Sequence, residues 1–434
     1  MRLALHWQIL IAICLAVIAG RMAGVDGSFS GVHFYSLFDF IGALFLNALK
    51  MIIVPLIVSS MISSISGMSN IDGLGRLGAK TIAFYLVSSL LAILVGLTIV
   101  NVIQPGIVNG EPAKEILGVN DAELASVIDK VEGHSATDVF DIFLNMVPPN
   151  IVAAAADGQM LGIIFFSLLF GYFVTKIKPD LAKIQSRFWQ SIMDVMMEMT
   201  NWIMKFAPIG VFGLVAKVIA GIDADQMHIL IVSLGGFTLS VLLALAIHVF
   251  ITMPLILAFI AKVNPIRHYR AMTPALLTAF STASSSATLP LTMECVRDRA
   301  GVSNRTSSFV LPLGATVNMD GTALYECVAA MFIAQAYGLE LGIGTQFLIV
   351  TVALLTSIGV AGIPAASLVA ITIILTTIGL PVEAIGLILA VDRILDMFRT
   401  SVNVFSDSCA AVVIARSEGE TTFLVDSANA KQPV

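Results

Sequence analysis

The sequence predicts an all-α polytopic membrane protein, and two observations support that prediction. Of the 434 residues, 58% are hydrophobic and 12% are charged, and the mean hydropathy is +0.95. Soluble domains carry about 25% charged residues, so this chain has too few to cover a water-facing surface. Apolar runs long enough to cross a bilayer recur from end to end. The composition therefore excludes a soluble enzyme, a disordered chain and a nucleic-acid-binding protein.

The apolar runs form ten stretches, which alternate with polar connections. They lie near residues 8–24, 37–67, 78–103, 151–176, 190–220, 227–260, 271–296, 306–337, 345–379 and 381–416. Basic residues gather in the connections at 76–80, 176–187 and 262–270, which the positive-inside rule assigns to the cytoplasm. The connection at 104–141 holds eight acids and two bases and so accounts for the whole net charge of −6. This loop is expected outside, with both chain termini in the cytoplasm.

Two of the ten stretches are predicted to be re-entrant hairpins. Stretch 271–296 has basic flanks on both sides and stretch 345–379 has acidic ones, so each should return to the side it came from. Their centres, 281–290 and 358–367, are rich in serine, glycine or proline. Irregular backbone is tolerated in a membrane only inside protein or beside a polar cavity, and paired broken segments mark transporter binding sites. The fold class is therefore eight transmembrane helices plus two re-entrant helical hairpins, with kinked ordinary spans as the alternative.

The last stretch carries charges in a place where each costs about 2.5–3.5 kcal/mol. At 100° per residue, five polar positions fall within about 80° of one another and form one stripe. These positions are Asp392, Asp396, Arg399, Asn403 and Asp407. A buried arginine suits a carboxylate, and the excess acids suit an ammonium group or a cation. A self-satisfied salt-bridge network is the structural alternative.

The stretch 306–337 predicts a local break in the helix. Asn318, Asp320 and Thr322 are spaced two apart, so they cannot share one face of a regular helix. Amide, carboxylate and freed carbonyl oxygens are hard ligands that suit a small cation such as Na⁺. No cysteine or histidine cluster supports soft-metal chemistry. We expect His248, inside a span, to be a hydrogen-bonded core residue.

Five motifs together resemble one transporter family. They are KMIIVP at 50–55, SSSATLP at 284–290, NMDGT at 318–322, AGIP at 361–364 and DMFRTSVN at 396–403. In this order they resemble the dicarboxylate/amino acid:cation symporters, which include archaeal aspartate transporters, bacterial glutamate carriers and animal excitatory amino acid transporters. The similarity runs from the second stretch to Arg416.

The resemblance implies an architecture as well as an activity. It implies a homotrimer in the lipid bilayer that works by an elevator mechanism. The short loops and the absent glycosylation context separately lead us to expect the inner membrane of a bacterial cell. Residues 1–77 and 106–222 would form the scaffold, 78–105 and 223–417 the transport domain, and 418–434 a cytoplasmic tail. The second hairpin would be the extracellular gate.

The resemblance also assigns substrate contacts. Arg399 would bind the side-chain carboxylate of an acidic amino acid, and Asp396 its ammonium group. Asn403, Thr322, Ser285 and the second hairpin would complete the site. The full predicted set is Arg399, Asp396, Asn403, Thr322, Ser284, Ser285, Ile363, Ser367 and Thr400. An arginine at position 399 favours aspartate or glutamate, with a C4-dicarboxylate second.

Three sodium sites are implied in the same way. The first would use Asp407, Asn318 and Asn403 with the Gly314 carbonyl. The second would use Asp320 with Tyr85, Ser88 and Ser89, and the third carbonyls near Thr316, Ser357, Ile358 and Val360. The resemblance therefore implies that the co-transported cation is Na⁺.

Some positions depart from the common family pattern. Glu326 stands where archaeal relatives have glutamine, so we hypothesise H⁺ coupling there, and K⁺ counter-transport is a weaker hypothesis. A second arginine, usual at the place of Ala283 or Met397, is missing from both, and Arg393 lies nearby. Ser367 and Ser406 replace glycines.

Three other functions are weighed against a symporter of acidic amino acids. A channel fits poorly with ligand groups enclosed behind hairpins. An intramembrane enzyme built on Ser284–Ser286 lacks a neighbouring base, so no enzymatic activity is expected. A neutral amino acid carrier is the close alternative within the family.

Overall fold

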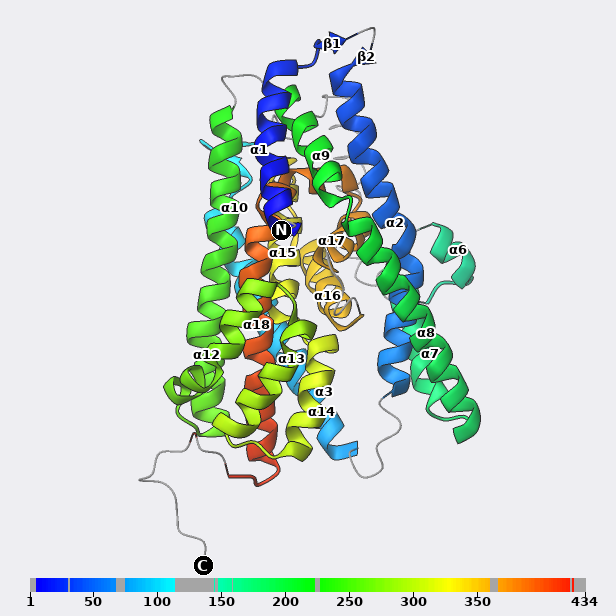
Figure 1. Cartoon of the computed structure of the whole chain (residues 1–434), viewed down its shortest axis with the longest axis vertical. Coiled ribbons are helices and arrows are strands. Elements are labelled where there is room, and N and C mark those ends of the chain that lie inside the picture. Colours follow the sequence, from blue (N-terminus) through cyan, green and yellow to red (C-terminus); the bar gives the residue numbers. More distant parts are fainter. Residues whose placement is uncertain are drawn as a thin grey trace, which may run out of the picture.

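The protein is almost entirely helical (Figure 1). The computed structural model describes residues 5–29, 32–67, 75–113, 144, 147–157, 159–222, 227–359, 366–421 and 424. Two short antiparallel strand pairs, β1 (Ser28–Phe29) with β2 (Val32–His33) and β3 (Ile107–Val108) with β4 (Glu111–Pro112), lie at helix ends. The helices form two groups, which we call the first and the second group.

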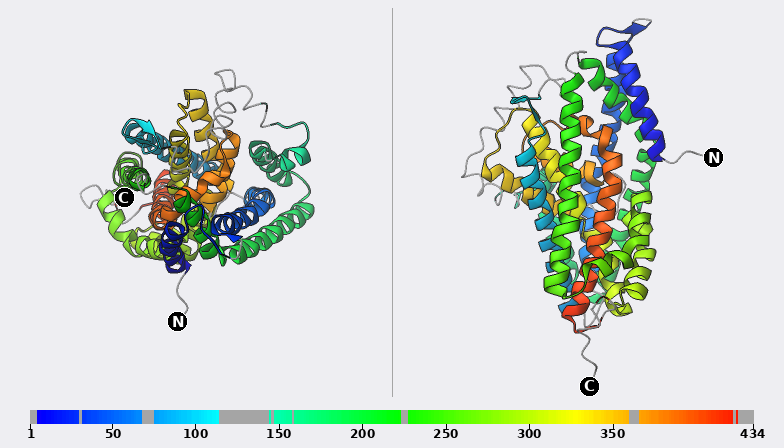
Figure 2. Two further views of the ribbon diagram at one scale, coloured as in Figure 1. Left: turned by 90° about the horizontal axis from the view of Figure 1, so that it is seen from above. Right: turned by 90° about the vertical axis from the view of Figure 1, so that its left-hand side faces the viewer.

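The first group contains α1 (Leu5–Ala23), α2 (Phe34–Gly67), α6 (Ile151–Ala156), α7 (Met160–Val174), α8 (Pro179–Met204) and α9 (Ala207–Gly221). Helix α1 packs on α9, and α2 packs on α7, α8 and α9. The approach of α9 to α2 depends on Gly213, because a Cβ there would lie 2.8 Å from the backbone N of Gly42. In the view from above, α2, α7 and α8 lie on one side of α16 and α17, and α3 and α10 lie on the other (Figure 2).

The second group contains a long, nearly continuous helix, two helical hairpins and a broken helix. Its elements are α3 (Gly75–Ile103), α10 (Met227–Ile247), η4 (His248–Thr252), α11 (Met253–Leu255), η5 (Ile256–Ala261), α12 (Pro265–Thr282), α13 (Ser285–Glu294), η6 (Cys295–Arg299), α14 (Asn304–Val317), α15 (Asp320–Ala336), α16 (Ile343–Gly359), α17 (Ala366–Thr377), η7 (Val382–Ala384) and α18 (Ile385–Ser417). Helix α18 contacts α10, α12, α14 and α15, and α3 packs on α15. All 17 residues of α15 are buried, so this helix is the centre of the group.

Both predicted hairpins consist of two helices that pack on each other, α12 with α13 and α16 with α17. In the first, the turn is confined to Ala283 and Ser284, and Ala283 adopts a left-handed φ of 48°. The Ser284 side chain caps α13 by accepting from the N–H of Ala287 at 3.2 Å. The predicted tip, 281–290, is thus mostly helical. The centre of the second hairpin, 360–365, lies outside the described residues.

Two predicted stretches are wrong in detail, because each contains a break. Stretch 190–220 consists of α8 and α9, which meet at an angle of 56°. Pro208 has no N–H and occupies the first turn of α9, where it cannot continue the hydrogen-bond ladder of α8. Stretch 151–176 divides between α6 and α7, with Asp157 ending α6.

Within the described ranges, three helices are long and apolar enough to cross a membrane, and four if α8 and α9 count as one bent span. The three are Phe34–Ser63, Arg76–Ile103 and Met227–Ala261. Of the other predicted spans, α1 and α7 are apolar but shorter, α14 and α15 are separated by a break, and α18 carries charges. The chain is a helical membrane protein, and the number of eight spans remains a prediction.

The chain beyond α18 is docked on the second group. The Glu418 carboxylate accepts from Arg76 at 2.7 Å and from Lys80 at 2.6 Å. These hydrogen bonds lower the pKa of Glu418 to about 2, so the carboxylate stays ionised at physiological pH. Glu420 accepts from the backbone N–H and the hydroxyl of Ser303. The predicted cytoplasmic tail therefore begins as a segment that joins α3, α14 and α18.

Candidate functional site

The break between α14 and α15 places polar groups deep in the second group. Asn318 has extended backbone angles, φ −110° and ψ 101°, and Met319 also leaves the helical region. The predicted unwinding at this position is confirmed. The side chains of Asn318 and Asp320 are fully buried and face α3 and α18.

Asp320 accepts hydrogen bonds from three different helices. Ser88 and Ser89 of α3 donate to its Oδ1 at 3.2 and 2.6 Å. Ser406 of α18 donates to Oδ2 at 2.5 Å, and His248 Nε2 of η4 lies 3.1 Å from the same oxygen. The structure thus brings together Asp320, Ser88 and Ser89 of the second predicted sodium set.

Asp407 forms a second polar cluster beside the first. Asn318 Nδ2 donates to Asp407 Oδ1 at 2.9 Å. Only glycine fits at position 314, because a Cβ there would lie 2.5 Å from Asp407 Oδ1 and 2.7 Å from the Tyr85 hydroxyl. Tyr85 itself donates to the Val310 carbonyl at 2.7 Å rather than to Asp320.

Asn403 joins α18 to α15. Its Oδ1 accepts from the N–H of Gly321 at 2.8 Å, and its Nδ2 donates to Thr322 Oγ1 at 3.1 Å. The predicted neighbours Asn403 and Thr322 therefore meet. Together the two clusters offer carboxylate, amide and hydroxyl oxygens, which suit a hard cation. Within the described ranges, no group of three or more His, Cys, Asp or Glu residues could hold a metal ion.

Arg399 is 1% exposed and is partly paired. Its Nη2 donates to Asp392 Oδ1 and to Asp396 Oδ1, both at 3.0 Å. The guanidinium carbon lies 3.8 Å from the centroid of the Tyr325 ring, a cation–π contact. Its Nε and Nη1 are buried without a hydrogen-bond partner among the described residues. Two of the three guanidinium nitrogens are therefore left to bind a ligand.

Glu326 lies on α15 and is 1% exposed. Its Oε2 accepts from the Thr356 hydroxyl of α16 at 2.9 Å. This hydrogen bond joins α15 to the second hairpin.

The hairpin residues are placed less completely. Ser285 begins α13 and is half-buried, and Ser367 and Ser357 are buried in α17 and α16. Thr400 is buried on α18. Ile363 and Val360 lie outside the described residues, as do the side chains of Thr316 and Ile358. The third predicted sodium site and the predicted gate thus remain predictions.

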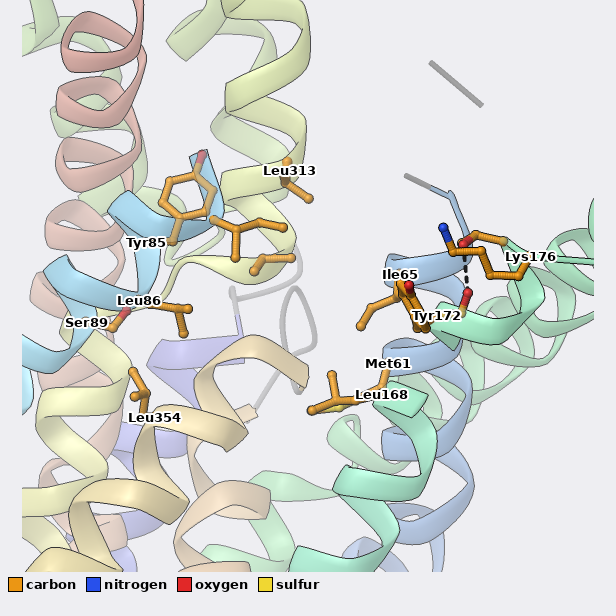
Figure 3. A pocket seen from close by; sticks show the side chains of 13 residues that line it. Met61, Ile65, Tyr85, Leu86, Ser89, Leu168, Tyr172, Lys176, Leu313 and Leu354 are labelled. Carbon is orange, nitrogen blue, oxygen red and sulfur yellow. Dashed lines mark hydrogen bonds between the residues drawn. The ribbon is translucent and has the colours of Figure 1, made fainter. Parts of the chain in front are cut away.

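A mainly apolar cavity of about 600 Å³ separates the two groups (Figure 3). Leu168 of α7 and Lys176, just beyond the end of α7, line one wall, and Tyr85 and Ser89 of α3 line the opposite wall. Lys176 Nζ lies 5.1 Å from the centroid of the Tyr172 ring. Because Ser89 also donates to Asp320, this cavity reaches the edge of the first cluster.

Several contacts of the site residues were not predicted from the sequence. His248 is buried and hydrogen-bonded as expected, but its partner Asp320 was not predicted. Thr356 and Tyr325 received no role, although they contact Glu326 and Arg399. The available signal was physical, because a charge inside a membrane requires a partner. Asp392 was on the predicted stripe without a role, and it pairs with Arg399.

Two comparisons with known proteins agree on one family. The profile of the sodium:dicarboxylate symporter family matches residues 5–417. The chain is 34% identical over 422 residues to the proton/sodium-glutamate symport protein of Geobacillus stearothermophilus, with 96% of each chain covered. It is 35% identical over 420 residues to the proton/glutamate-aspartate symporter of Escherichia coli, covering 96% of this chain and 93% of that one.

A relative with a different named substrate is equally similar. The chain is 38% identical over 435 residues to the neutral amino acid transporter B(0) of Bos taurus, covering 92% of this chain and 78% of the relative. Overall identity therefore does not separate acidic from neutral substrates, and the residues of the site must do so.

Proposed function

Because the chain belongs to the sodium:dicarboxylate symporter family, we propose that it takes up acidic amino acids, L-aspartate or L-glutamate, together with Na⁺. The unpartnered Nε and Nη1 of Arg399 support this proposal most directly. A buried donor without an acceptor carries a desolvation penalty, and a ligand carboxylate removes it with charge-assisted hydrogen bonds. A neutral side chain would leave both donors unsatisfied.

Asp396 supports an amino acid over a plain C4-dicarboxylate. Its side chain is 22% exposed and lies 3.0 Å from Arg399. A carboxylate beside the guanidinium suits the ammonium group of an amino acid. A dicarboxylate carries no such group and would place an extra negative charge beside Asp396.

The buried acids support coupling to cations. The Asp320 and Asp407 clusters would bind co-transported Na⁺, since uncompensated carboxylates inside a membrane are costly. Glu326, bonded to the hairpin residue Thr356, would carry a co-transported proton. K⁺ counter-transport is the weaker hypothesis. Each cluster of buried charges among the described residues already has a proposed role, so none remains to bind K⁺.

The two groups support an elevator. The second group would be the transport domain, residues 78–105 and 223–417, and the first group the scaffold, residues 1–77 and 106–222. Helix α8 exposes large apolar side chains, including Leu181, Phe188 and Trp202, and such a face suits the interface of a homotrimer. The protein would lie in the inner membrane with both termini in the cytoplasm.

The test is uptake of labelled L-aspartate by liposomes that hold the purified protein. We expect accumulation with an inward Na⁺ gradient and none without it. Unlabelled glutamate should compete, whereas serine and succinate should compete weakly. Accumulation driven by a pH gradient alone would indicate that uptake is coupled to H⁺ at Glu326 and not to Na⁺. Uptake of serine but not of aspartate would contradict the role of Arg399.

A further inference from the structure

Arg393 forms an ion pair with the residue expected to bind the substrate ammonium. Its Nη1 donates to Asp396 Oδ2 at 3.1 Å, while Arg399 Nη2 donates to Asp396 Oδ1 at 3.0 Å. The two oxygens of Asp396 are therefore held by two different arginines. Arg399 also bonds Asp392.

The four charged side chains form one chain of alternating sign along α18. Asp392, Arg399, Asp396 and Arg393 follow one another through contacts of 3.0 to 3.1 Å. Two acids and two bases sum to zero, so this part of the empty site carries no net charge. Without Arg393 the same site would carry one negative charge.

The surroundings of Arg393 are mainly apolar. Ile9 of α1, Phe45 of α2 and Val211 of α9 line the small cavity beside it. Asp392 also lines this cavity, but its ion pair among the described residues is with Arg399. The Arg393 side chain is 19% exposed, and its Nε has no partner among the described residues. A charged arginine side chain has a high free-energy cost beside these apolar side chains, which belong to the first group. Its pairing with Asp396 is what compensates its charge.

We propose that Arg393 is the internal counter-cation of Asp396 in the empty carrier. Its guanidinium holds the Asp396 oxygen that the ammonium group of the substrate takes over in the loaded carrier. The empty site then crosses the membrane without net charge and needs no counter-transported cation. This inference rests on the proposed function, because it assigns Asp396 to the substrate ammonium. Arg393 is a positioning residue that acts through Asp396.

The experiment compares net uptake with exchange in liposomes. Net uptake requires the empty carrier to return, whereas exchange of labelled for unlabelled substrate uses only the loaded carrier. For Arg393→Gln we expect net uptake to fall by about tenfold or more, since an unpaired buried charge must cross the bilayer. Exchange should stay within about twofold of wild type, since the substrate ammonium replaces the missing cation. Arg393→Lys should restore net uptake.

The controls separate this role from a general loss of structure. Exchange by Arg393→Gln itself reports a folded, loaded carrier. Arg297→Gln removes the exposed Arg297–Asp298 pair and should change neither rate. Net uptake by wild type should be the same with internal K⁺ or internal choline.

Three outcomes would overturn the inference. The first is an equal loss of net uptake and exchange in Arg393→Gln with rescue by lysine, which would show that the Arg393 charge is needed in the loaded carrier. The second is a ratio of net uptake to exchange in Arg393→Gln that equals the ratio in wild type. The third is wild-type net uptake that requires internal K⁺.

Failure of the proposed function would look different. If the wild-type protein transports serine instead of aspartate, the ratio is measured with serine, which has the same ammonium group. The inference then survives while the acidic substrate does not.

Discussion

The first and second groups of helices bury polar side chains in different ways. In the first group, Ser59, Ser167 and Thr200 donate to carbonyls of their own helices. The cross-helix bond of Ser63 to Gln190 is an exception. In the second group, Asp320 and Asp407 accept from side chains of other elements. Every buried aspartate, glutamate, arginine and histidine among the described residues lies in this second group.

This difference shows that the directional polar interactions, which can select a ligand, lie in the second group. Apolar contacts and close-packed glycines hold the first group together, and these interactions are non-directional. Among the described residues, the hydrogen bonds and ion pairs of the buried charges in the second group are made within that group, so moving the group as one body would not break them. The comparison therefore supports the proposed elevator, and the following variants are ways to challenge it.

The largest effect is expected at Arg399. In Arg399→Gln the substrate carboxylate loses a charged partner in a buried site, a loss of about 2–5 kcal/mol, or at least about 30-fold in aspartate affinity. L-serine should bind as well as before or better. Binding of both labelled substrates to the purified protein measures this. An equal loss for serine and aspartate would show that Arg399 supports the fold of the second group instead.

The next effect concerns the cations. In Asp407→Asn the second cluster loses its carboxylate, so the Na⁺ concentration for half-maximal uptake should rise by about tenfold, or about 1.4 kcal/mol. Ser408→Ala is the matched control, because Ser408 is buried one residue away and contacts His268. Unaltered Na⁺ dependence in Asp407→Asn would remove this residue from the sodium site.

A qualitative effect is expected at Glu326. Replacing Glu326 with Gln removes the ionisable group, so net uptake should lose its dependence on external pH while keeping its dependence on Na⁺. Thr356→Val breaks the hydrogen bond but leaves the carboxyl able to take up a proton, so its pH dependence should remain. A pH profile of Glu326→Gln that matches wild type would contradict proton coupling at this residue.

The smallest effect is expected between the groups. Lys50 of α2 and Glu383 of η7 form an ion pair at 3.2 Å, which among pairs of described residues is the one that joins the two groups. Exposed pairs contribute about 0.2–1 kcal/mol, so Lys50→Gln or Glu383→Gln should shift the equilibrium between elevator positions by at most about fivefold. Energy transfer between dyes on α8 and η6 measures the shift. A double variant that shifts it further than either single variant would argue against a direct pair.

Much of the second group could be predicted from the sequence because its signals are local. The two-residue spacing of Asn318 and Asp320 predicted the break, and the spacing along α18 predicted that Asp392, Asp396 and Arg399 share one face. Both features follow from helix geometry within a few residues.

Long-range partners could not be predicted in the same way. His248 and Asp320 are 72 residues apart, and nothing in either segment specifies their contact. The bend between α8 and α9 was missed because hydropathy continues across it while Pro208 interrupts only the backbone. Arg393 is a local case instead, because it lies off the polar stripe by its angle on the helix and its long side chain still reaches the neighbouring acid Asp396.

The separation of Ser88 and Ser89 from Asp320 has a consequence for the synthesis of the protein. These partners are 232 and 231 residues apart, so at about 5–20 residues per second α3 exists for roughly 10–50 s before α15 is made. In that interval Ser88 can donate to the Tyr85 carbonyl of its own helix, and α3 is apolar enough to remain alone in lipid. Helix α18, which carries the buried Asp392, Arg399 and Asp407, is the last of the described helices to be made, and it packs on α3 and α15, which are made before it. The order of the helices along the chain thus adds these three charges after the polar groups of α3 and α15 have been synthesised.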